Sequence, residues 1–300
     1  MIDDARAGAI RPPPSPAVGR MLIVGAALLW STSGLFVKAP LFVDWPVAER
    51  GALLAFWRAT FAAVVLIPFV RRPRWRIGLI PLCIAFTAMN VLYLSAMSMT
   101  TAANAIWLQS TAPFWVFLIG AIGFRQPVPR GDLLPLAFAC GGVGLILAFE
   151  SQGESVAGVS LGLASGLAYG LVVLLLHQLA DEDSAWLIAL CHAVAAAFLL
   201  PWVFARGVWP SAGQLGVLAG FGTVQMAVPY LLLTVGLRSV RGQEAVLIGL
   251  LEPIVLPLWV WMAWHERPDR WTVAGAGLIL VGLVLRYGRD LLRRDRANEV

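Results

Sequence analysis

The chain alternates long apolar runs with short polar connections along most of its length. Each run has about eighteen or more residues, enough to cross roughly 30 Å of hydrocarbon as an α-helix. Lipid offers no hydrogen bonds to an open backbone, so runs of this length favour helices over barrel strands. The pattern predicts an all-α integral membrane protein with ten transmembrane helices, at residues 21–37, 51–70, 77–97, 102–123, 131–149, 157–177, 184–205, 213–236, 243–264 and 271–287.

The two ends of the chain are polar. Residues 1–20 are proline-rich and predict a disordered cytoplasmic tail, and residues 288–300 predict a basic cytoplasmic tail. The apolar run after Arg20 continues through Val37 without a clear small-residue cleavage site. We therefore interpret this run as the first transmembrane helix rather than as a signal peptide.

Composition and charge support this class. The chain is 59% hydrophobic and 13% charged, whereas soluble domains average about 45–50% apolar and about 25% charged residues. Of the 22 lysines and arginines, sixteen fall on the side of the N-terminus, five on the opposite side and Arg58 inside a span. The positive-inside rule predicts cytoplasmic termini in a multi-pass protein of the plasma (bacterial inner) membrane. Because these connections account for the charge of +5, we expect no nucleic-acid partner.

The two halves of the sequence resemble each other. Adding 140 to residue numbers lays helices 4 and 5 on helices 9 and 10 without a gap, with Pro113 meeting Pro253. Adding 133 lays helix 2 on helix 7, with Pro68 meeting Pro201. Single matches are weak because alanine, glycine and leucine are common here, but the register holds over helix lengths and in the same order. The halves predict two five-helix repeats, 21–149 and 157–287.

An odd number of helices per repeat makes the second copy enter the membrane from the opposite side. The sequence therefore predicts two inverted repeats (5+5) related by a pseudo-two-fold axis in the membrane plane. Inverted repeats are typical of secondary transporters, where two related halves give alternating access to a central site. The alternative, a duplicated membrane protein without a transport role, is disfavoured because the repeats supply the two near-equivalent states that alternating access needs.

Glu252 lies near the bilayer midplane in the ninth helix. A carboxylate there costs about 2.5–3.5 kcal/mol on insertion scales, so it is expected to face a cavity or a partner. We interpret Glu252 as a substrate-binding residue and a candidate for proton coupling. The alternative is a structural carboxyl group bonded to a neighbouring helix.

Prolines next to this position are predicted to bend the helices. Pro253 cannot donate to the carbonyl of Gly249, and its counterpart Pro113 frees the carbonyl of Gln109. Pro257 is a third candidate kink. The counterpart of Glu252 is Ala112, so the predicted site has one titratable group and one neutral amide. Gln109 either lines the cavity or packs between helices.

Further polar and aromatic residues at similar depth are candidates to line the cavity, although aromatic side chains in membranes more often pack or lie at interfaces. They are Trp30, Asn90, Tyr93, Tyr169, Gln225 and Tyr230. Arg58 is expected to snorkel to the headgroups, and His192 is expected to be structural. Cys83, Cys140 and Cys191 show no paired or metal-ligand spacing, and the glycines of helices 6 and 8 predict close helix packing.

Several kinds of chemistry lack their motifs. The chain has no phosphate-binding loop ending in Lys-Ser or Lys-Thr, no zinc-protease motif and no serine nucleophile elbow. We therefore expect no metal, no cofactor and no enzymatic activity; an intramembrane enzyme is the least favoured alternative.

Three motifs resemble the drug/metabolite transporter (DMT) superfamily, EamA type. They are Phe56-Trp57-Arg58, the run 102–113, and Leu251-Glu252-Pro253 leading to His265-Glu266. The family often has Gly-Glu after helices 4 and 9; here Arg125-Gln126 departs from that pattern in the first copy. Over residues 21–287 the resemblance implies ten helices, a central cavity lined by helices 1, 3, 4, 6, 8 and 9, and transport of small organic molecules.

Together these observations predict a secondary-active exporter of amino acids or related metabolites that works by alternating access. A passive facilitator using the same cavity is the alternative. The expected partners are a small-molecule substrate, the lipid bilayer and protons as coupling ion.

Overall fold

A computed structural model describes residues 14–123, 131, 133–150 and 155–298, and this part of the chain is helical without strands. The prediction of an all-α membrane protein is confirmed. The α-helices are α1 (Pro16–Trp30), α2 (Ser33–Val37), α3 (Val47–Leu66), α4 (Leu79–Met99), α5 (Ala102–Gln109), α6 (Ala112–Leu118), α7 (Leu133–Glu150), α8 (Ser155–Gln178), α9 (Ser184–Arg206), α10 (Ala212–Gly222), α11 (Val228–Gly236), α12 (Gly242–Gly249), α13 (Leu251–Trp264) and α14 (Arg270–Asn298).

Within the described residues, nine helical stretches are long and apolar enough to cross a membrane, and α7 is a shorter apolar helix. Several of these stretches combine two labelled helices, for example α1 with α2 and α12 with α13. The first helix begins at Pro16 rather than at 21, and residues 1–13 of the predicted tail lie outside the described part. Helix α14 continues to Asn298, past its predicted end at 287, because the added residues are mostly good helix formers.

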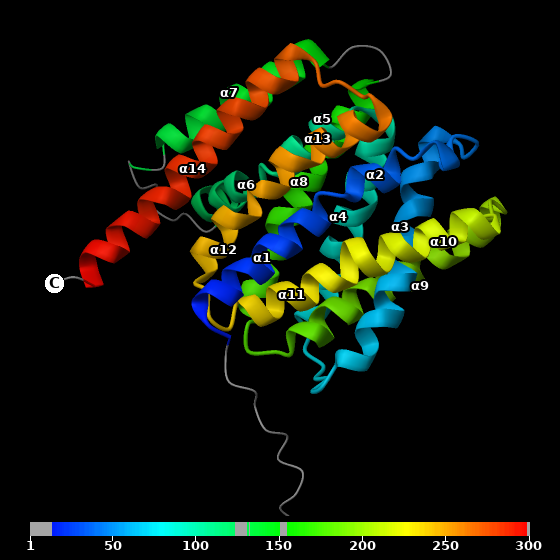
Figure 1. Ribbon diagram of the computed structural model, residues 1–300, viewed down its shortest axis with the longest axis horizontal. Helices are drawn as coiled ribbons and strands as arrows, with labels where there is room; N and C mark the ends of the chain where they lie inside the picture. The colour runs from blue at the N-terminus through cyan, green and yellow to red at the C-terminus, as the bar shows by residue number, and fades with distance from the viewer. Residues whose placement is uncertain (1–13, 124–130, 132, 151–154, 299–300) are drawn as a thin grey trace, which may run out of the picture.

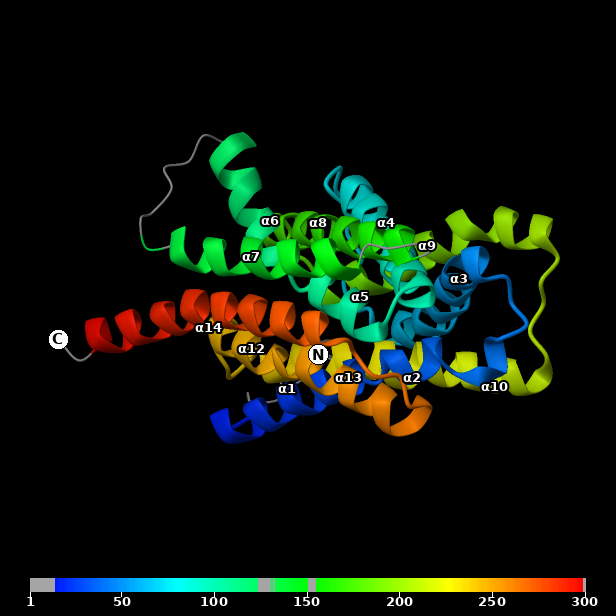
Figure 2. The same cartoon turned by 90° about the horizontal axis from the view of Figure 1, so that it is seen from above.

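In the described part of the chain, four helix pairs form the most extensive contacts between the first half and the second half. They pair α1 with α11, α3 with α9, α4 with α8, and α7 with α14; Figures 1 and 2 both show α7 beside α14. In order of span these are pairs 1–8, 2–7, 3–6 and 5–10. If each span is replaced by its counterpart in the other repeat, five spans along the chain, the same four pairs result. A two-fold relation between the repeats requires this.

Glycines allow several of these contacts. A Cβ atom on Gly166 of α8 would lie 2.6 Å from the Leu108 carbonyl oxygen, and one on Gly142 of α7 would lie 2.4 Å from the Gly275 carbonyl oxygen. The predicted packing role of the helix 6 glycines is therefore confirmed. The same prediction is wrong for Gly216 of α10, because a Cβ atom there would have no neighbouring atom from another segment within 4 Å.

Four spans are interrupted near their middles. α1 gives way to α2 at Ser31–Thr32, α5 to α6 at Ser110–Thr111, and α12 to α13 at Leu250. A π-helical turn, Thr223–Ala227, separates α10 from α11. Helix α13, in contrast, is continuous through Pro257. Because broken helices expose backbone groups, polar side chains and a cavity are expected at this depth.

Candidate functional site

A cavity of about 430 Å³ lies where the interrupted spans meet. Its wall includes residues from α1, α3, α4, α5, α8, α11 and α12, and so from both repeats. All eight residues predicted from the sequence border this one cavity: Trp30, Asn90, Tyr93, Gln109, Tyr169, Gln225, Tyr230 and Glu252. Pro113 and Pro253 border it too, whereas Pro257 does not belong to its wall.

The cavity extends from the middle of the bundle toward one of its two ends. Its wall reaches Leu176 near the end of α8, Leu237 just after α11, and Gly242 at the start of α12. We call this end of the bundle the Arg76 end, after the basic connection that also lies there, and the opposite end the Lys38 end.

Glu252 and Gln109 are placed by two of the interrupted spans, α12–α13 and α5–α6. Glu252 lies in the first turn of α13, and Gln109 is the last residue of α5. The Glu252 carboxylate borders the cavity and has no hydrogen bond or ion pair among the described residues, although it interacts electrostatically with Arg58. A carboxylate without a contact partner in a membrane cavity is available to a proton or to a cationic group of a ligand.

Arg58 corrects an expectation. The side chain does not snorkel to the headgroups: it is 2% exposed and forms part of the cavity wall. Its guanidinium donates to the Oδ1 atom of Asn90 and, at 3.4 Å, to the Oε1 atom of Gln225, and lies 5.0 Å from the centre of the Phe221 ring. Two amides from different repeats offset the burial of the cation, which is why it stays at depth.

The interruption at Ser31 adds residues that the sequence analysis did not select. Ser31 Oγ accepts a hydrogen bond from Trp259 Nε1 at 3.0 Å, and Gln225 Nε2 donates to the Trp30 carbonyl oxygen at 3.2 Å. Ser33 Oγ and Tyr93 Oη lie 3.2 Å apart. The run Trp30-Ser31-Thr32-Ser33 could have indicated this break, because hydroxyl side chains bond local carbonyls and compete with helix.

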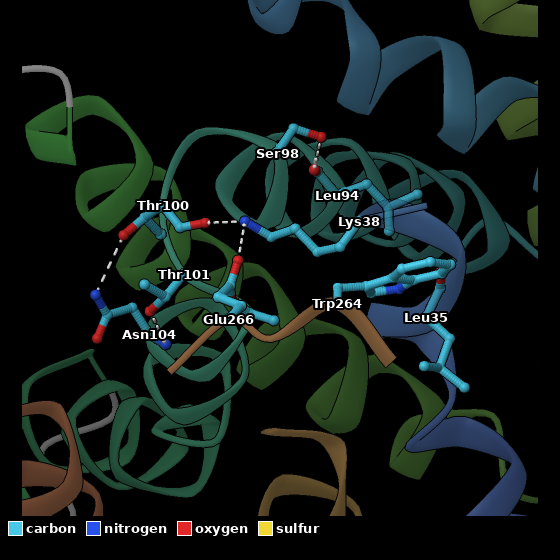
Figure 3. Close-up of polar contacts among 10 residues, drawn as sticks. Leu35, Lys38, Leu94, Ser98, Thr100, Thr101, Asn104, Trp264 and Glu266 are labelled. Carbon is cyan, nitrogen blue, oxygen red and sulfur yellow. Dashed lines mark hydrogen bonds and ion pairs between the residues drawn. The ribbon is translucent and has the colours of Figure 1, made fainter. Parts of the chain in front are cut away.

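A polar network closes the Lys38 end (Figure 3). Lys38 Nζ lies 2.7 Å from Glu266 Oε2 and donates to the Thr100 carbonyl oxygen at 2.7 Å. Glu266 Oε1 accepts from the backbone N–H of Ala102, at the start of α5. We call Lys38, Thr100, Ala102 and Glu266 the outer latch, because the charge pattern of the sequence predicts that the Lys38 end faces away from the cytoplasm. It joins the end of α2 and the α4–α5 connection to the α13–α14 connection, and so links the two repeats.

The Arg76 end is held by a second network, between the α3–α4 and α8–α9 connections. Arg76 pairs with Asp181 and Glu182, and Trp186 Nε1 donates to the Arg74 carbonyl oxygen at 2.9 Å. Burial alone would raise the pKa of the Asp183 carboxyl group, but the bonds it accepts from four backbone N–H groups lower it instead. These contacts join the α3–α4 connection to the α8–α9 connection.

The structure also bears on the expectations for the cysteines, for His192 and for metal binding. Cys83 and Cys191 are free thiols from α4 and α9 whose Sγ atoms lie 3.9 Å apart, a proximity that their spacing in the sequence does not show. His192 is fully buried, its ring meets the Phe86 ring edge-on, and neither ring nitrogen has a hydrogen-bond partner. His192 does not border the cavity. Among the described residues, no three His, Cys, Asp or Glu side chains gather as metal ligands.

Comparisons with known proteins find relatives that align along most of the chain. An uncharacterized transporter of Archaeoglobus fulgidus is 29% identical over 90% of this chain and 96% of its own length. The pseudopaline exporter CntI of Pseudomonas aeruginosa is 24% identical over 89% of this chain and 94% of its own length. One solved crystal structure, 18% identical, superposes with a TM-score of 0.62 over 90% of this chain and 97% of that chain, and thus shares the fold.

The model of the EamA-like transporter family matches the chain twice, over residues 17–148 and 156–288. The motif position Arg125-Gln126, where the first copy departs from the family pattern, lies outside the described residues. The two matches together cover most of the chain. The protein is a multi-pass membrane protein that belongs to the EamA-like transporter family of the DMT superfamily.

Proposed function

We propose that this protein is a secondary-active exporter of amino acids or related metabolites that works by alternating access between two inverted five-helix repeats. One observation carries the proposal. The cavity between the repeats extends to the Arg76 end, while the outer latch joins both repeats across the Lys38 end. A site closed on one side and open on the other is one of the two states that alternating access requires.

The direction of opening follows from charge. The connection at residues 71–76 carries four arginines, and the positive-inside rule puts such connections in the cytoplasm. With both termini on that side of a bacterial inner membrane, the cavity of this state opens to the cytoplasm. A state that loads from the cytoplasm suits an exporter, and one relative bears the name of an exporter.

Proton coupling through Glu252 extends the proposal. The carboxylate borders the cavity and has no hydrogen bond or ion pair among the described residues, so a proton and a substrate can compete for it. A passive facilitator uses the same cavity without this competition. An intramembrane enzyme lacks support, because the residues around the cavity include no paired nucleophile and base.

The test is solute flux in proteoliposomes with and without an imposed pH gradient. We expect the gradient to accelerate amino-acid flux in the wild type, and a proton ionophore to remove that acceleration. Glu252→Gln should lose the accelerated component. Glu244→Gln, which removes a carboxylate of the same span paired with Arg20 outside the cavity, should keep it.

Two outcomes would count against this function. Flux that follows the solute gradient alone, indifferent to the ionophore, would establish the passive facilitator. Absence of flux for every amino acid and metabolite of a broad panel, from protein that is folded in the liposomes, would reject the transport function.

A further inference from the structure

Arg58 is a cation in the cavity wall whose contacts are all with neutral groups. Its two hydrogen-bond partners, Asn90 and Gln225, are amides, and no ion pair with Arg58 occurs among the described residues. A guanidinium has five N–H donors. Here Nε has no partner, and the 3.4 Å contact to Gln225 is longer than a usual N–H···O bond. The charge and part of the donor set therefore remain available to an anion.

Glu252 presents the opposite charge to the same cavity. It interacts electrostatically with Arg58, but the two side chains form no direct ion pair. Buried opposite charges usually pair, because each offsets the desolvation of the other. Because both border the cavity without pairing directly, they leave two complementary positions for a ligand that carries both charges.

We propose that Arg58 and Glu252 together select zwitterions, with the substrate carboxylate bound by Arg58 and its ammonium group bound by Glu252. The inference rests on the proposed transport function and adds the residues that recognise each end of the substrate. Arginine suits the first role, because its planar fork forms charge-assisted, often bidentate bonds to a carboxylate.

The rest of the wall defines what the zwitterion carries between its charges. Met89, Val172, Leu233 and Leu250 border the cavity, and apolar walls with a few placed polar groups are usual for small-molecule sites. The substrate class is therefore an amino acid, or a similar zwitterion, with an apolar side chain.

The test uses ligands that share one skeleton and differ by one charge. L-leucine carries both groups, L-leucinamide lacks the carboxylate, and 4-methylpentanoate lacks the ammonium group; L-methionine and L-phenylalanine provide two further sets. Isothermal titration of purified wild type should show the zwitterion binding about 10- to 100-fold more tightly than either relative, as expected for one lost charged hydrogen-bonding contact. Equal affinity for leucine and leucinamide would overturn the role of Arg58.

Two variants separate recognition from structure. Arg58→Gln should abolish the preference over leucinamide and keep the preference over 4-methylpentanoate, and Glu252→Gln should do the reverse. If Arg58 has only a structural role, Arg58→Gln should weaken the binding of all three ligands by similar factors. Arg206→Gln and Glu244→Gln remove matched charges outside the cavity and should leave both preferences intact. If Arg58→Gln does not fold, Arg58→Lys keeps the charge and should reduce, rather than abolish, the preference over leucinamide.

The failure of this inference is distinguishable from failure of the transport function. If no zwitterion of the three sets binds, the inference is wrong. Flux of any other solute by the same protein in proteoliposomes would then leave the transport function standing.

Discussion

Two of the four interrupted spans, α5–α6 and α12–α13, occupy related places in the repeats but differ in their surroundings. All eight residues of α5 are buried, whereas among the described side chains of α12 only Ala245 is buried. Helix α5 starts with Thr101 accepting from the N–H of Asn104 and with Glu266 accepting from Ala102. The start of α12 has no side-chain cap hydrogen bond, and it is tied to α1 by the more exposed ion pair of Glu244 with Arg20.

The hydrogen bonds at the two breaks show the same contrast, because the first break is better satisfied by side chains than the second. Ser110 and Thr111 donate their hydroxyl groups to the carbonyl oxygens of Ile106 and Leu108. The second break, at Leu250, has an apolar side chain and is followed by Glu252. Both spans border the cavity, but the first satisfies its break internally and packs against α8, whereas the second is more exposed. Spans at related places in the two repeats thus differ in how tightly the rest of the protein encloses them.

The largest effect that would test this contrast is on ligand binding. Glu252→Ala should weaken the binding of a transported solute about 10- to 100-fold, because a charged contact is lost, and Gln109→Ala should weaken it only about fivefold, as for a neutral hydrogen bond. Ligand-dependent thermal shifts measure both, since a ligand that binds the folded state raises its stability. Equal losses would show that both breaks serve the ligand equally.

The next largest expected effect is on stability, and it tests how tightly the two spans are packed. Gly166→Ala would place a Cβ atom 2.6 Å from the Leu108 carbonyl oxygen and 2.7 Å from Thr111 Oγ1, so we expect a loss of stability of about 1–3 kcal/mol. Gly249, in the second span, has no atom within 4 Å of its Cβ position. Gly249→Ala should therefore leave stability unchanged or raise it by up to about 1 kcal/mol.

Thermal unfolding in detergent compares these two variants directly. A similar fall in the unfolding temperature for both would mean that the second span is as tightly enclosed as the first.

The smallest effect concerns the outer latch, which holds the start of α5. Lys38 and Glu266 side chains are 19% and 24% exposed, so a double-mutant cycle of Lys38→Met and Glu266→Gln should give a coupling of about 0.5–1 kcal/mol. The more exposed pair Arg206 and Glu49, at 49% and 22%, is the control and should couple more weakly. A latch coupling no larger than that of the control would remove its role in fixing α5.

The fold was predictable because its determinants are local. Runs of apolar residues set the helices, and the register between the halves indicated the repeats before any contact was known. The eight cavity residues were found by a similar local argument, since a polar or aromatic side chain at midplane depth must face something other than lipid. Their role in substrate binding stays a prediction.

The misplaced or missed features depend on contacts between distant segments. Arg58 looked like a snorkelling residue because Asn90 and Gln225 lie on other helices, and only the folded chain brings the three together. The same holds for Lys38 and Glu266. Sequence position alone gives the depth of a charge but not its neighbours, so it cannot decide whether that charge turns to the headgroups or inward.

The pairing of spans has a consequence for how the protein is made. Helix α1 packs on α11 and α3 packs on α9. The first spans are therefore inserted into the bilayer before their packing partners in the second half have been synthesised. Arg58 meets Asn90 soon after insertion, but Gln225 arrives only with the eighth span. During synthesis the first half is therefore an incompletely packed intermediate with a partly satisfied cation, and quality-control proteases would recognise it there if the second half were delayed.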